Sequence, residues 1–274
     1  MWHHQQSSAS NAASAWKMLR LVFHGAVRDV RSGTRTPIWG LIKDIVQAAL
    51  LVLVFYVMFE LLGTRRFAIR GDFLVYVMSG IFLFLTFNKS LAGTASADGA
   101  TSPLMQHAPM NTIVALGAGA LSALYRQFLA VAVMLGLYHL AVRPVEFYDP
   151  VAVLGVFMMA WFCGASIGVL FYAITPWAPG PFGMIRQFYT RANMITSGKM
   201  FVANSLPPTL LMFFDWNPLF HIIDQARGFA FINYNPHFSS LSYPFWVGMA
   251  CLTLGLMIEF TTRRSASVSW TAGR

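Results

Sequence analysis

Residues 198–236, GKMFVANSLPPTLLMFFDWNPLFHIIDQARGFAFINYNP, decide how the chain folds. The segment is apolar enough to enter a membrane, but Pro207 and Pro208 interrupt the backbone hydrogen bonds that a continuous helix needs. The apolar run after them, TLLMFFD, has seven residues, whereas a helix that crosses a bilayer needs about 20. We therefore expect a hydrophobic segment that enters the membrane zone, stops at the prolines and starts again.

A second helix start follows within the same segment. Asn217 is a favourable N-cap and Pro218 fits the first helical turn. About ten to twelve residues with helical periodicity follow, which are too few for a span and typical of a re-entrant or interfacial helix. Arg227 comes three positions after Asp224, a spacing that favours an ion pair along this helix.

The broken segment also predicts a function. Backbone amides find no hydrogen-bond partner in lipid, so two short helices must be enclosed by protein or line a water-filled path. We therefore expect a gate or vestibule on the outer side of a transport path. The residues predicted to form this gate are Pro207, Pro208, Asn217, Pro218, His221, Asp224 and Arg227.

The overall composition is typical of a membrane protein. Of the 274 residues, 57% are hydrophobic and 11% are charged, whereas soluble domains carry about 25% charged residues. The net charge of +9 does not indicate nucleic-acid binding, because the basic residues lie in short clusters beside apolar runs. Cys163 and Cys251 lie within apolar runs and are predicted to be buried thiols, neither a disulfide nor a metal pair.

Six apolar segments are long enough to span a membrane. They cover residues 37–62, 73–92, 113–142, 151–175, 182–206 and 243–260. We therefore predict an all-α integral membrane protein with six transmembrane helices and two short re-entrant helices between the fifth and the sixth. The excess of Lys and Arg on one side of these segments predicts that both termini are cytoplasmic. The predicted division is a disordered tail (1–14), an interface helix (15–35), a transmembrane domain (36–262) and a cytoplasmic tail (263–274).

A basic amphipathic helix precedes the first span. In SAWKMLRLVFHGAVRDVRSG, residues 14–33, apolar side chains follow helical spacing and basic side chains share the other face. Such a helix is expected to lie in the cytoplasmic headgroup layer, either as an anchor alone or as an anchor that also contacts a cytoplasmic partner. The residues chosen to represent it are Trp16, Arg20, Phe23, Arg28 and Arg31.

This layout resembles the membrane subunit of ABC-2 type polysaccharide exporters, which move capsule or O-antigen chains across a bacterial inner membrane. The resemblance covers nearly the whole chain: an amphipathic helix, six spans, and a pair of short re-entrant helices. Its most specific part is SGKMFVANSLPPTLLMFFDWNPLFHIIDQAR, residues 197–227. There, Asn217 with Pro218, His221 and Arg227 match the family pattern together.

The resemblance implies a dimer of permeases in the inner membrane, each copy bound to a cytoplasmic ATP-binding subunit. The chain has no G-x-x-x-x-G-K-[ST] motif, since TSGKM at residues 196–200 lacks the upstream glycine and the following Ser or Thr. We therefore expect no enzyme activity and no bound cofactor in this chain, with ATP and Mg²⁺ on the partner ATPase. The other expected partners are a polysaccharide or glycolipid and candidate periplasmic and outer-membrane export proteins, but not nucleic acid.

The loop of residues 96–112 has the position of the family's coupling helix. The resemblance therefore implies that it contacts the ATPase, whereas an ordinary surface loop is the alternative. The residues predicted to make this contact are Pro103, Leu104, Met105, Gln106, His107, Ala108, Pro109 and Met110.

The resemblance also implies that the first and fifth spans line the channel. Aromatic rings there could stack on sugars, although aromatic residues in spans also serve as packing or interface residues. Lys199 and Arg126 are costly at membrane depth unless they face a partner or water. They are candidate cations for an anionic substrate, and an ion pair inside the bundle or snorkelling to the interface is the alternative. The channel candidates are Phe55, Tyr56, Phe59, Arg126, Lys199, Phe201, Phe213, Phe214 and Trp216.

Two other function classes stay open at this point. An ABC-2 type exporter of teichoic acid, lipids or drugs would have the same layout. A polytopic membrane transferase would need a positioned carboxylate or histidine, but the ten acidic residues are dispersed, without D-x-D or H-E-x-x-H spacing. The function that we expect is export of a polysaccharide that is lipid-linked and anionic.

Overall fold

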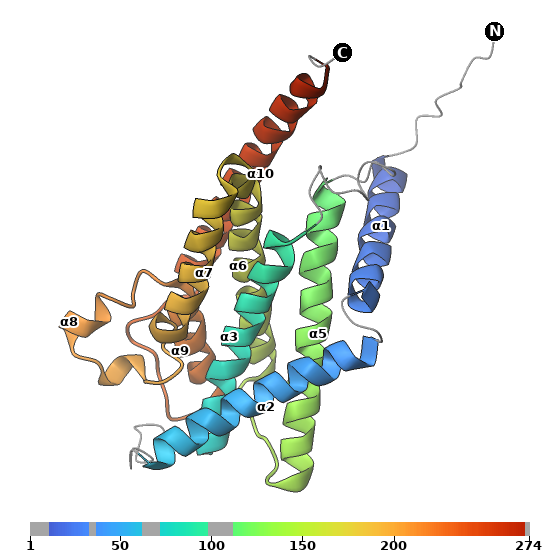
Figure 1. Ribbon diagram of the computed structural model, residues 1–274. Helices are drawn as coiled ribbons and strands as arrows, with labels where there is room; N and C mark the ends of the chain where they lie inside the picture. Colours follow the sequence, from blue (N-terminus) through green and yellow to red (C-terminus); the bar gives the residue numbers. More distant parts are fainter. Residues whose placement is uncertain (1–10, 33–36, 62–71, 98–111, 272–274) are drawn as a thin grey trace.

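The computed structural model describes residues 11–32, 37–61, 72–97 and 112–271. Within these ranges the chain is helical and contains no strand. Five helices run roughly side by side (Figure 1): α3 (Phe73–Ala95), α5 (Thr112–Ala141), α6 (Pro150–Ile174), α7 (Pro179–Thr196) and α10 (Ser242–Thr271). Helix α2 (Pro37–Leu61) crosses α3 and α5 obliquely, and α1 (Asn11–Ser32) packs on α5.

Five of the described helices are long and apolar enough to cross a membrane. They contain the segments Ile38–Leu61, Phe73–Ala95, Thr112–Ala141, Pro150–Trp177 and Ser242–Thr262. These segments coincide with five of the six apolar runs predicted from the sequence. The described part of the chain is therefore all-helical, and its long apolar helices are typical of a membrane protein.

The remaining predicted span, residues 182–206, differs from the structure. Helix α7 ends at Thr196, and a loop with a short 3₁₀ turn, η2 (Ala203–Ser205), takes up the rest. Gly198 follows the helix with φ +72°, the left-handed conformation that commonly ends helices. The helix therefore stops ahead of the two prolines, and Pro208 instead begins the short helix α8 (Pro208–Leu211).

The two ends of the described chain also differ from the predicted division. Helix α1 begins at Asn11, within the tail predicted to be disordered, and α10 continues to Thr271, within the predicted C-terminal tail. Helix α1 packs on α5 through small residues, since a Cβ added at Gly25 would lie 2.8 Å from that of Ala118. Trp16 and Phe23 are exposed, so part of the apolar face of α1 is free to meet lipid.

Helix α3 occupies the centre of the bundle. It contacts α2, α5, α6 and α9 (Pro218–Ala230), and Phe87 on α3 is fully buried. Helix α6 approaches α3 closely, because a Cβ at Gly168 would lie 2.5 Å from the carbonyl oxygen of Leu91. Such small-residue contacts are typical of helices that pack in membranes. Of the two free cysteines, Cys163 is buried as predicted and Cys251 is half-buried.

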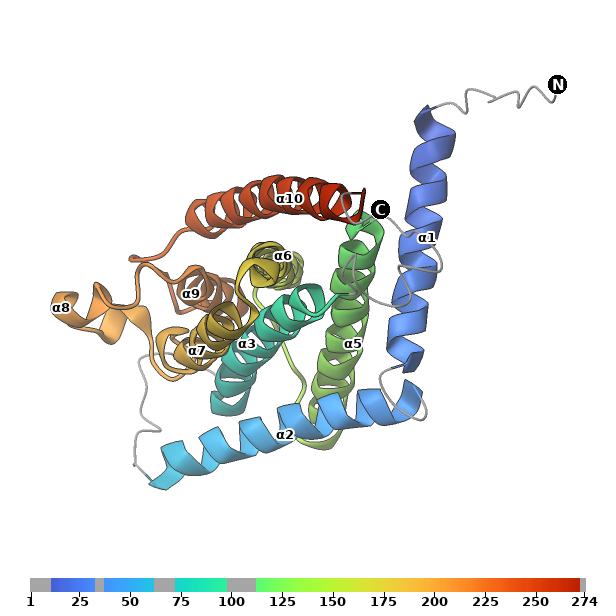
Figure 2. The ribbon, with the colours of Figure 1, turned by 45° about the horizontal axis from the view of Figure 1, so that its top comes forward.

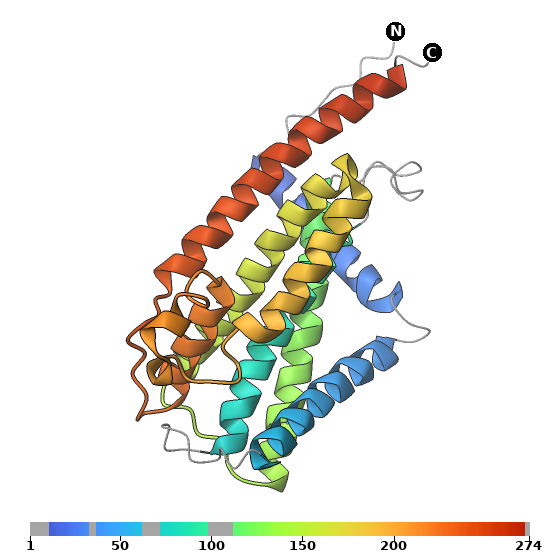
Figure 3. The same ribbon diagram turned by 60° about the vertical axis from the view of Figure 1, so that its left-hand side comes forward.

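Helix α9 is enclosed by the long helices. It contacts α3, α6 and α10, and Figure 2 shows it among these helices and α7. Helix α7 ends part-way along the bundle, beside α9 (Figure 3). The start of α1 and the end of α10 lie toward one end of the bundle, and α8 and α9 lie toward the other (Figure 1).

Candidate functional site

Arg227 on α9 joins this helix to the loop that follows α7. Its Nη1 atom donates hydrogen bonds to the carbonyl oxygens of Gly198, at 3.0 Å, and Phe201, at 2.5 Å. Its Nη2 atom donates to the carbonyl oxygen of Lys199 at 2.8 Å. Only 1% of Arg227 is exposed. Its guanidinium N–H groups therefore donate to backbone carbonyl oxygens that would bind water if they lay at the surface.

Glycines make room for this arrangement. At Gly198 the positive φ favours glycine, and an added Cβ would lie 2.6 Å from a ring carbon of Phe220. At Gly80 on α3, an added Cβ would lie 3.2 Å from Nη2 of Arg227. We call Arg227 together with residues 198–201 the Arg227 clasp. Helix α3 at Gly80 and the ring of Phe220 on α9 both approach it closely.

The ion pair predicted between Asp224 and Arg227 does not form, because each side chain has other partners. The Asp224 carboxylate accepts hydrogen bonds from the hydroxyl groups of Tyr234 and Ser239. The guanidinium of Arg227 instead lies over the ring of Tyr76, with its central carbon 4.2 Å from the ring centroid. The prediction was wrong because backbone carbonyls and an aromatic face outcompete a carboxylate one turn away.

Asp224 therefore fixes the loop after α9. Burial raises the pKa of the Tyr234 phenol, and the neighbouring Asp224 carboxylate raises it further. The phenol thus remains protonated, and its O–H group donates the hydrogen bond to the Asp224 carboxylate. This bond and the one from Ser239 hold residues 234–239 against α9.

Asn217 begins α9 as the sequence predicts. Its Oδ1 atom accepts a hydrogen bond from the backbone N–H of Leu219 at 3.0 Å, and Pro218 occupies the first turn. Its Nδ2 atom donates to Oδ1 of Asn193, at 2.9 Å, and to Oγ1 of Thr196, at 2.7 Å. Asn217 therefore caps one helix and ties it to the last turn of another.

His221 links the two loops that flank α9. Its Nε2 atom lies 2.7 Å from the carbonyl oxygen of Asp215, and its Nδ1 atom accepts a hydrogen bond from the backbone N–H of Ser240 at 3.2 Å. The side chain is buried. His221 therefore forms hydrogen bonds with the loop before α9 and with the loop after it.

Lys199 is buried beside the Arg227 clasp, with 3% of its surface exposed. Its ammonium lies 4.0 Å from the ring centroid of Phe84 and 5.4 Å from that of Phe55, and it donates a hydrogen bond to the carbonyl oxygen of Met194. In the described part of the chain it forms no ion pair. Aromatic faces and a carbonyl dipole hold this cation instead, so its charge is not cancelled by an acid.

The aromatic channel candidates do not share one surface. Phe55 and Phe59 are buried in the core, and Tyr56 is half-buried. The ring centroids of Phe201 and Phe214 lie 4.7 Å apart, so these rings pack on each other inside the loop region. By contrast, the side chains of Phe213 and Trp216 are exposed.

Arg126 lies away from the Arg227 clasp and forms an ion pair. Its Nη2 atom is 2.7 Å from Oδ2 of Asp44 on α2, and Nζ of Lys89 on α3 is 3.2 Å from Oδ1 of the same carboxylate. This confirms the alternative given for Arg126, an ion pair inside the bundle. The partner Asp44 was not predicted, although an acid inside the apolar run of the first span signals a buried partner.

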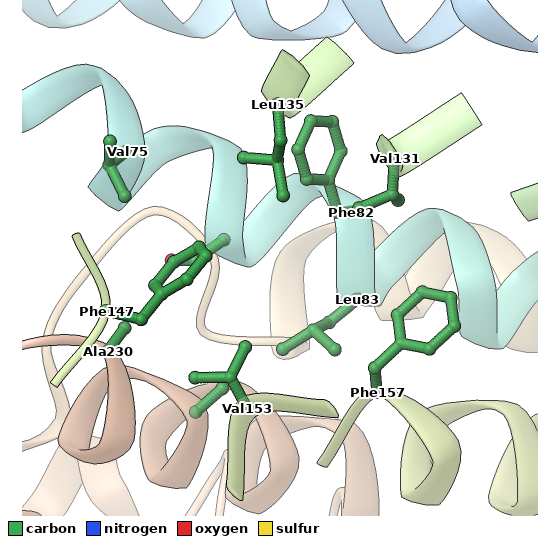
Figure 4. Close-up of a pocket in the computed structure, with 11 residues that line it drawn as sticks. Val75, Phe82, Leu83, Val131, Leu135, Phe147, Val153, Phe157 and Ala230 are labelled. Carbon is green, nitrogen blue, oxygen red and sulfur yellow. The ribbon is translucent and has the colours of Figure 1, made fainter. Parts of the chain in front are cut away.

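A small apolar cavity lies next to α9 (Figure 4). Its volume is about 60 Å³, and Val75, Leu83, Val153 and Ala230 are among the residues that line it. Binding pockets for small molecules measure about 300–1,000 Å³, so this space is too small for a sugar. It is a packing defect beside the site and not a substrate path.

Other predicted site residues have a different status. The proposed ATPase contact, residues 103–110, lies outside the described residues. On α1, Arg20 and Arg31 are exposed and Arg28 lies 3.7 Å from Asp29.

Among the described residues, no group of His, Cys, Asp and Glu could hold a metal ion. No protein-family model matches the chain, and no curated protein matches it.

Proposed function

We propose that this chain is the membrane subunit of an ATP-driven exporter of the ABC-2 type, which moves an anionic, lipid-linked polysaccharide across a bacterial inner membrane. In this proposal α2, α3, α5, α6 and α10 cross the membrane, α7 is a shortened fifth span that crosses it part-way, and α8 and α9 are re-entrant helices on the outer side. Both termini face the cytoplasm, two copies form the conduit, and a separate ATPase supplies the energy.

The observation that supports this proposal is the Arg227 clasp. A span that ends part-way, followed by short helices enclosed in the bundle, needs protein partners for its free backbone groups. Arg227 supplies them for Gly198, Lys199 and Phe201. A membrane protein with a purely structural role would not need a broken helix held by a buried arginine. A transport path, by contrast, needs an irregular segment that can change its packing.

Lys199 supports the anionic character of the substrate. A buried cation without an acidic partner in the described chain favours the approach of a negative group. Its position on the loop of the clasp means that a substrate charge drawn to Lys199 would act on the backbone that Arg227 holds. The proposal therefore links recognition of charge to movement of the outer gate.

The test is to co-express the chain with candidate ATP-binding subunits from the same genome and to purify the complexes. We expect one ATPase to co-purify, and its ATP hydrolysis to rise when an anionic lipid-linked polysaccharide is added. A neutral polymer serves as the matched control for substrate charge, and a partner ATPase lacking its phosphate-binding lysine is the control for hydrolysis. A chain that co-purifies with none of the candidates, or acts on a glycolipid alone, would contradict the proposal.

A further inference from the structure

A second charged site lies within the apolar helices, away from the Arg227 clasp. Asp44, Lys89 and Arg126 come from α2, α3 and α5, and each lies inside a segment apolar enough to span a membrane. We propose that Lys89 and Arg126, held in place by Asp44, bind the phosphate of an anionic membrane lipid. This inference does not rest on the proposed export function.

The charges of the cluster do not cancel. One carboxylate faces two cations, with Asp44 Oδ1 bound to Lys89 and Oδ2 bound to Arg126. The sum is one excess positive charge in a zone where charge is costly unless it is compensated. A phosphodiester supplies the missing negative charge.

The cations are accessible, whereas the acid is not. The side chains of Lys89 and Arg126 are each 32% exposed, and that of Asp44 is 1% exposed. A carboxylate buried beneath two half-exposed cations fixes their direction and presents them to the surface. Such an arrangement suits a binding site, because Asp44 orients the two basic groups that would contact the ligand.

Both cations keep hydrogen-bond donors for a ligand. An ammonium has three donors, and in the described chain that of Lys89 donates to Asp44. A guanidinium has five N–H groups. Arg126 uses Nε on Asp44, at 2.8 Å, and Nη2 on Asp44 and weakly on the carbonyl oxygen of Gly40. The remaining donors suit phosphate oxygens, which arginine and lysine bind well.

The location favours a lipid over free phosphate. Basic pockets between membrane helices bind lipid headgroups, while acyl chains lie on the apolar surface around them. Lys89 and Arg126 lie inside segments apolar enough to cross a membrane, so the exposed parts of their side chains are expected beside lipid and not in bulk water. A lipid can therefore satisfy both the charge and the apolar surroundings.

The test uses Lys89→Gln, because this change leaves the Asp44–Arg126 pair intact and neutral. No buried charge is orphaned, so the fold should persist. The matched control is Lys43→Gln, which removes an equal charge from the exposed residue beside Asp44 on the same helix. Lys89→Arg restores the charge. The full chain is purified in a neutral detergent, and bound phosphatidylglycerol and phosphatidylcholine are counted by native mass spectrometry.

We expect the purified chain to retain phosphatidylglycerol in preference to phosphatidylcholine. Lys89→Gln should reduce this preference about fivefold, which is the effect of one basic residue near an anionic lipid. Lys43→Gln and Lys89→Arg should keep it. Equal losses in Lys89→Gln and Lys43→Gln, or no preference in the unaltered chain, would overturn the proposal. Displacement of the lipid by inorganic phosphate at equal concentration would overturn the assignment to a lipid. Circular dichroism of each variant verifies that its fold is intact.

Discussion

The Nη1 atom of Arg227 lies 3.0 Å from the carbonyl oxygen of Gly198, which comes 29 residues earlier in the chain. A cation on a short buried helix thus supplies the hydrogen-bond donors that the end of α7 lacks. Because this guanidinium also reaches the carbonyl oxygens of Lys199 and Phe201, three hydrogen bonds hold the loop to α9.

Replacing Arg227 by alanine should weaken both stability and export. Three carbonyl groups would lose their donor, two of them in buried hydrogen bonds, at about 1–3 kcal/mol for each unsatisfied group, so we expect a loss of about 3 kcal/mol. Arg227→Lys should be intermediate, because an ammonium cannot reproduce the guanidinium fork. Thermal unfolding in detergent measures the stability, and polymer export is measured in cells. The control is Arg143→Ala at an exposed loop position, and an Arg227→Ala chain as stable as this control would contradict the clasp.

Gly198→Ala should destabilise the turn after α7. The left-handed backbone costs about 1–2 kcal/mol with a side chain, and the added Cβ would collide with Phe220. Gly136→Ala on α5 is the control, since an added Cβ there meets nothing within 4 Å and should stabilise the helix by about 0.5–1 kcal/mol. Unfolding midpoints that fall equally for both variants would show that Gly198 has no special role.

Asn217 should contribute both as a cap and as a tie to α7. Asn217→Ala is expected to cost about 1–2 kcal/mol, since the cap of Leu219 and two further hydrogen bonds are lost. Asn217→Asp retains the capping oxygen but cannot donate to Asn193 or Thr196. If the tie matters, the aspartate variant will lie below the unaltered chain in thermal stability. Equal stability of the aspartate variant and the unaltered chain would reduce Asn217 to a cap.

Lys199→Leu should reduce export of an anionic polymer more than that of a neutral one. The change removes the charge but keeps an apolar side chain against Phe55 and Phe84, so the packing is largely retained. Lys199→Arg is the control that retains the charge. Transport assays with one charged and one neutral polymer compare the two rates, and equal reductions would reject a role for this cation in substrate recognition.

Removal of residues 15–31 should lower the recovery of the complex with the ATPase. These residues form most of α1, which packs on the first half of α5, and in the sequence α5 follows the predicted coupling loop. Recovery is measured by affinity pull-down from solubilised membranes. A truncated chain that reaches the membrane and recovers as much ATPase as the full chain would show that α1 is an anchor alone.

The sequence predicts the parts of this fold that depend on local patterns. Apolar runs of sufficient length mark five helices, and Asn217 followed by Pro218 marks the start of α9. The end of α7 could not be predicted, because the apolar residues after Gly198 look like a continued span. The helix stops at a glycine in the left-handed conformation, and Arg227 binds the carbonyl groups that follow. Because every residue has a backbone carbonyl group, the sequence does not show which of them an arginine will bind.

The partners of charged residues were harder to predict than their burial. Asp44 and Arg126 are 82 residues apart, and only the crossing of α2 over α5 brings them together. Asp224 and Arg227 have the spacing of an ion pair, yet Tyr234 and the loop after α7 lie closer to their charged groups. Spacing along one helix is therefore a weak guide where other elements supply competing partners.

Labelling of single cysteines tests the proposed outer gate, with α9 enclosed behind it, most directly. In a chain whose Cys163 and Cys251 are replaced by alanine, Phe213→Cys at an exposed site and Ala226→Cys at a buried site on α9 are treated with a membrane-impermeant maleimide in intact cells with a permeable outer membrane. We predict that Phe213→Cys reacts and that Ala226→Cys does not. Reaction of Phe213→Cys only after cell lysis, or equal reaction at both positions, would contradict a gate that faces outward and encloses α9.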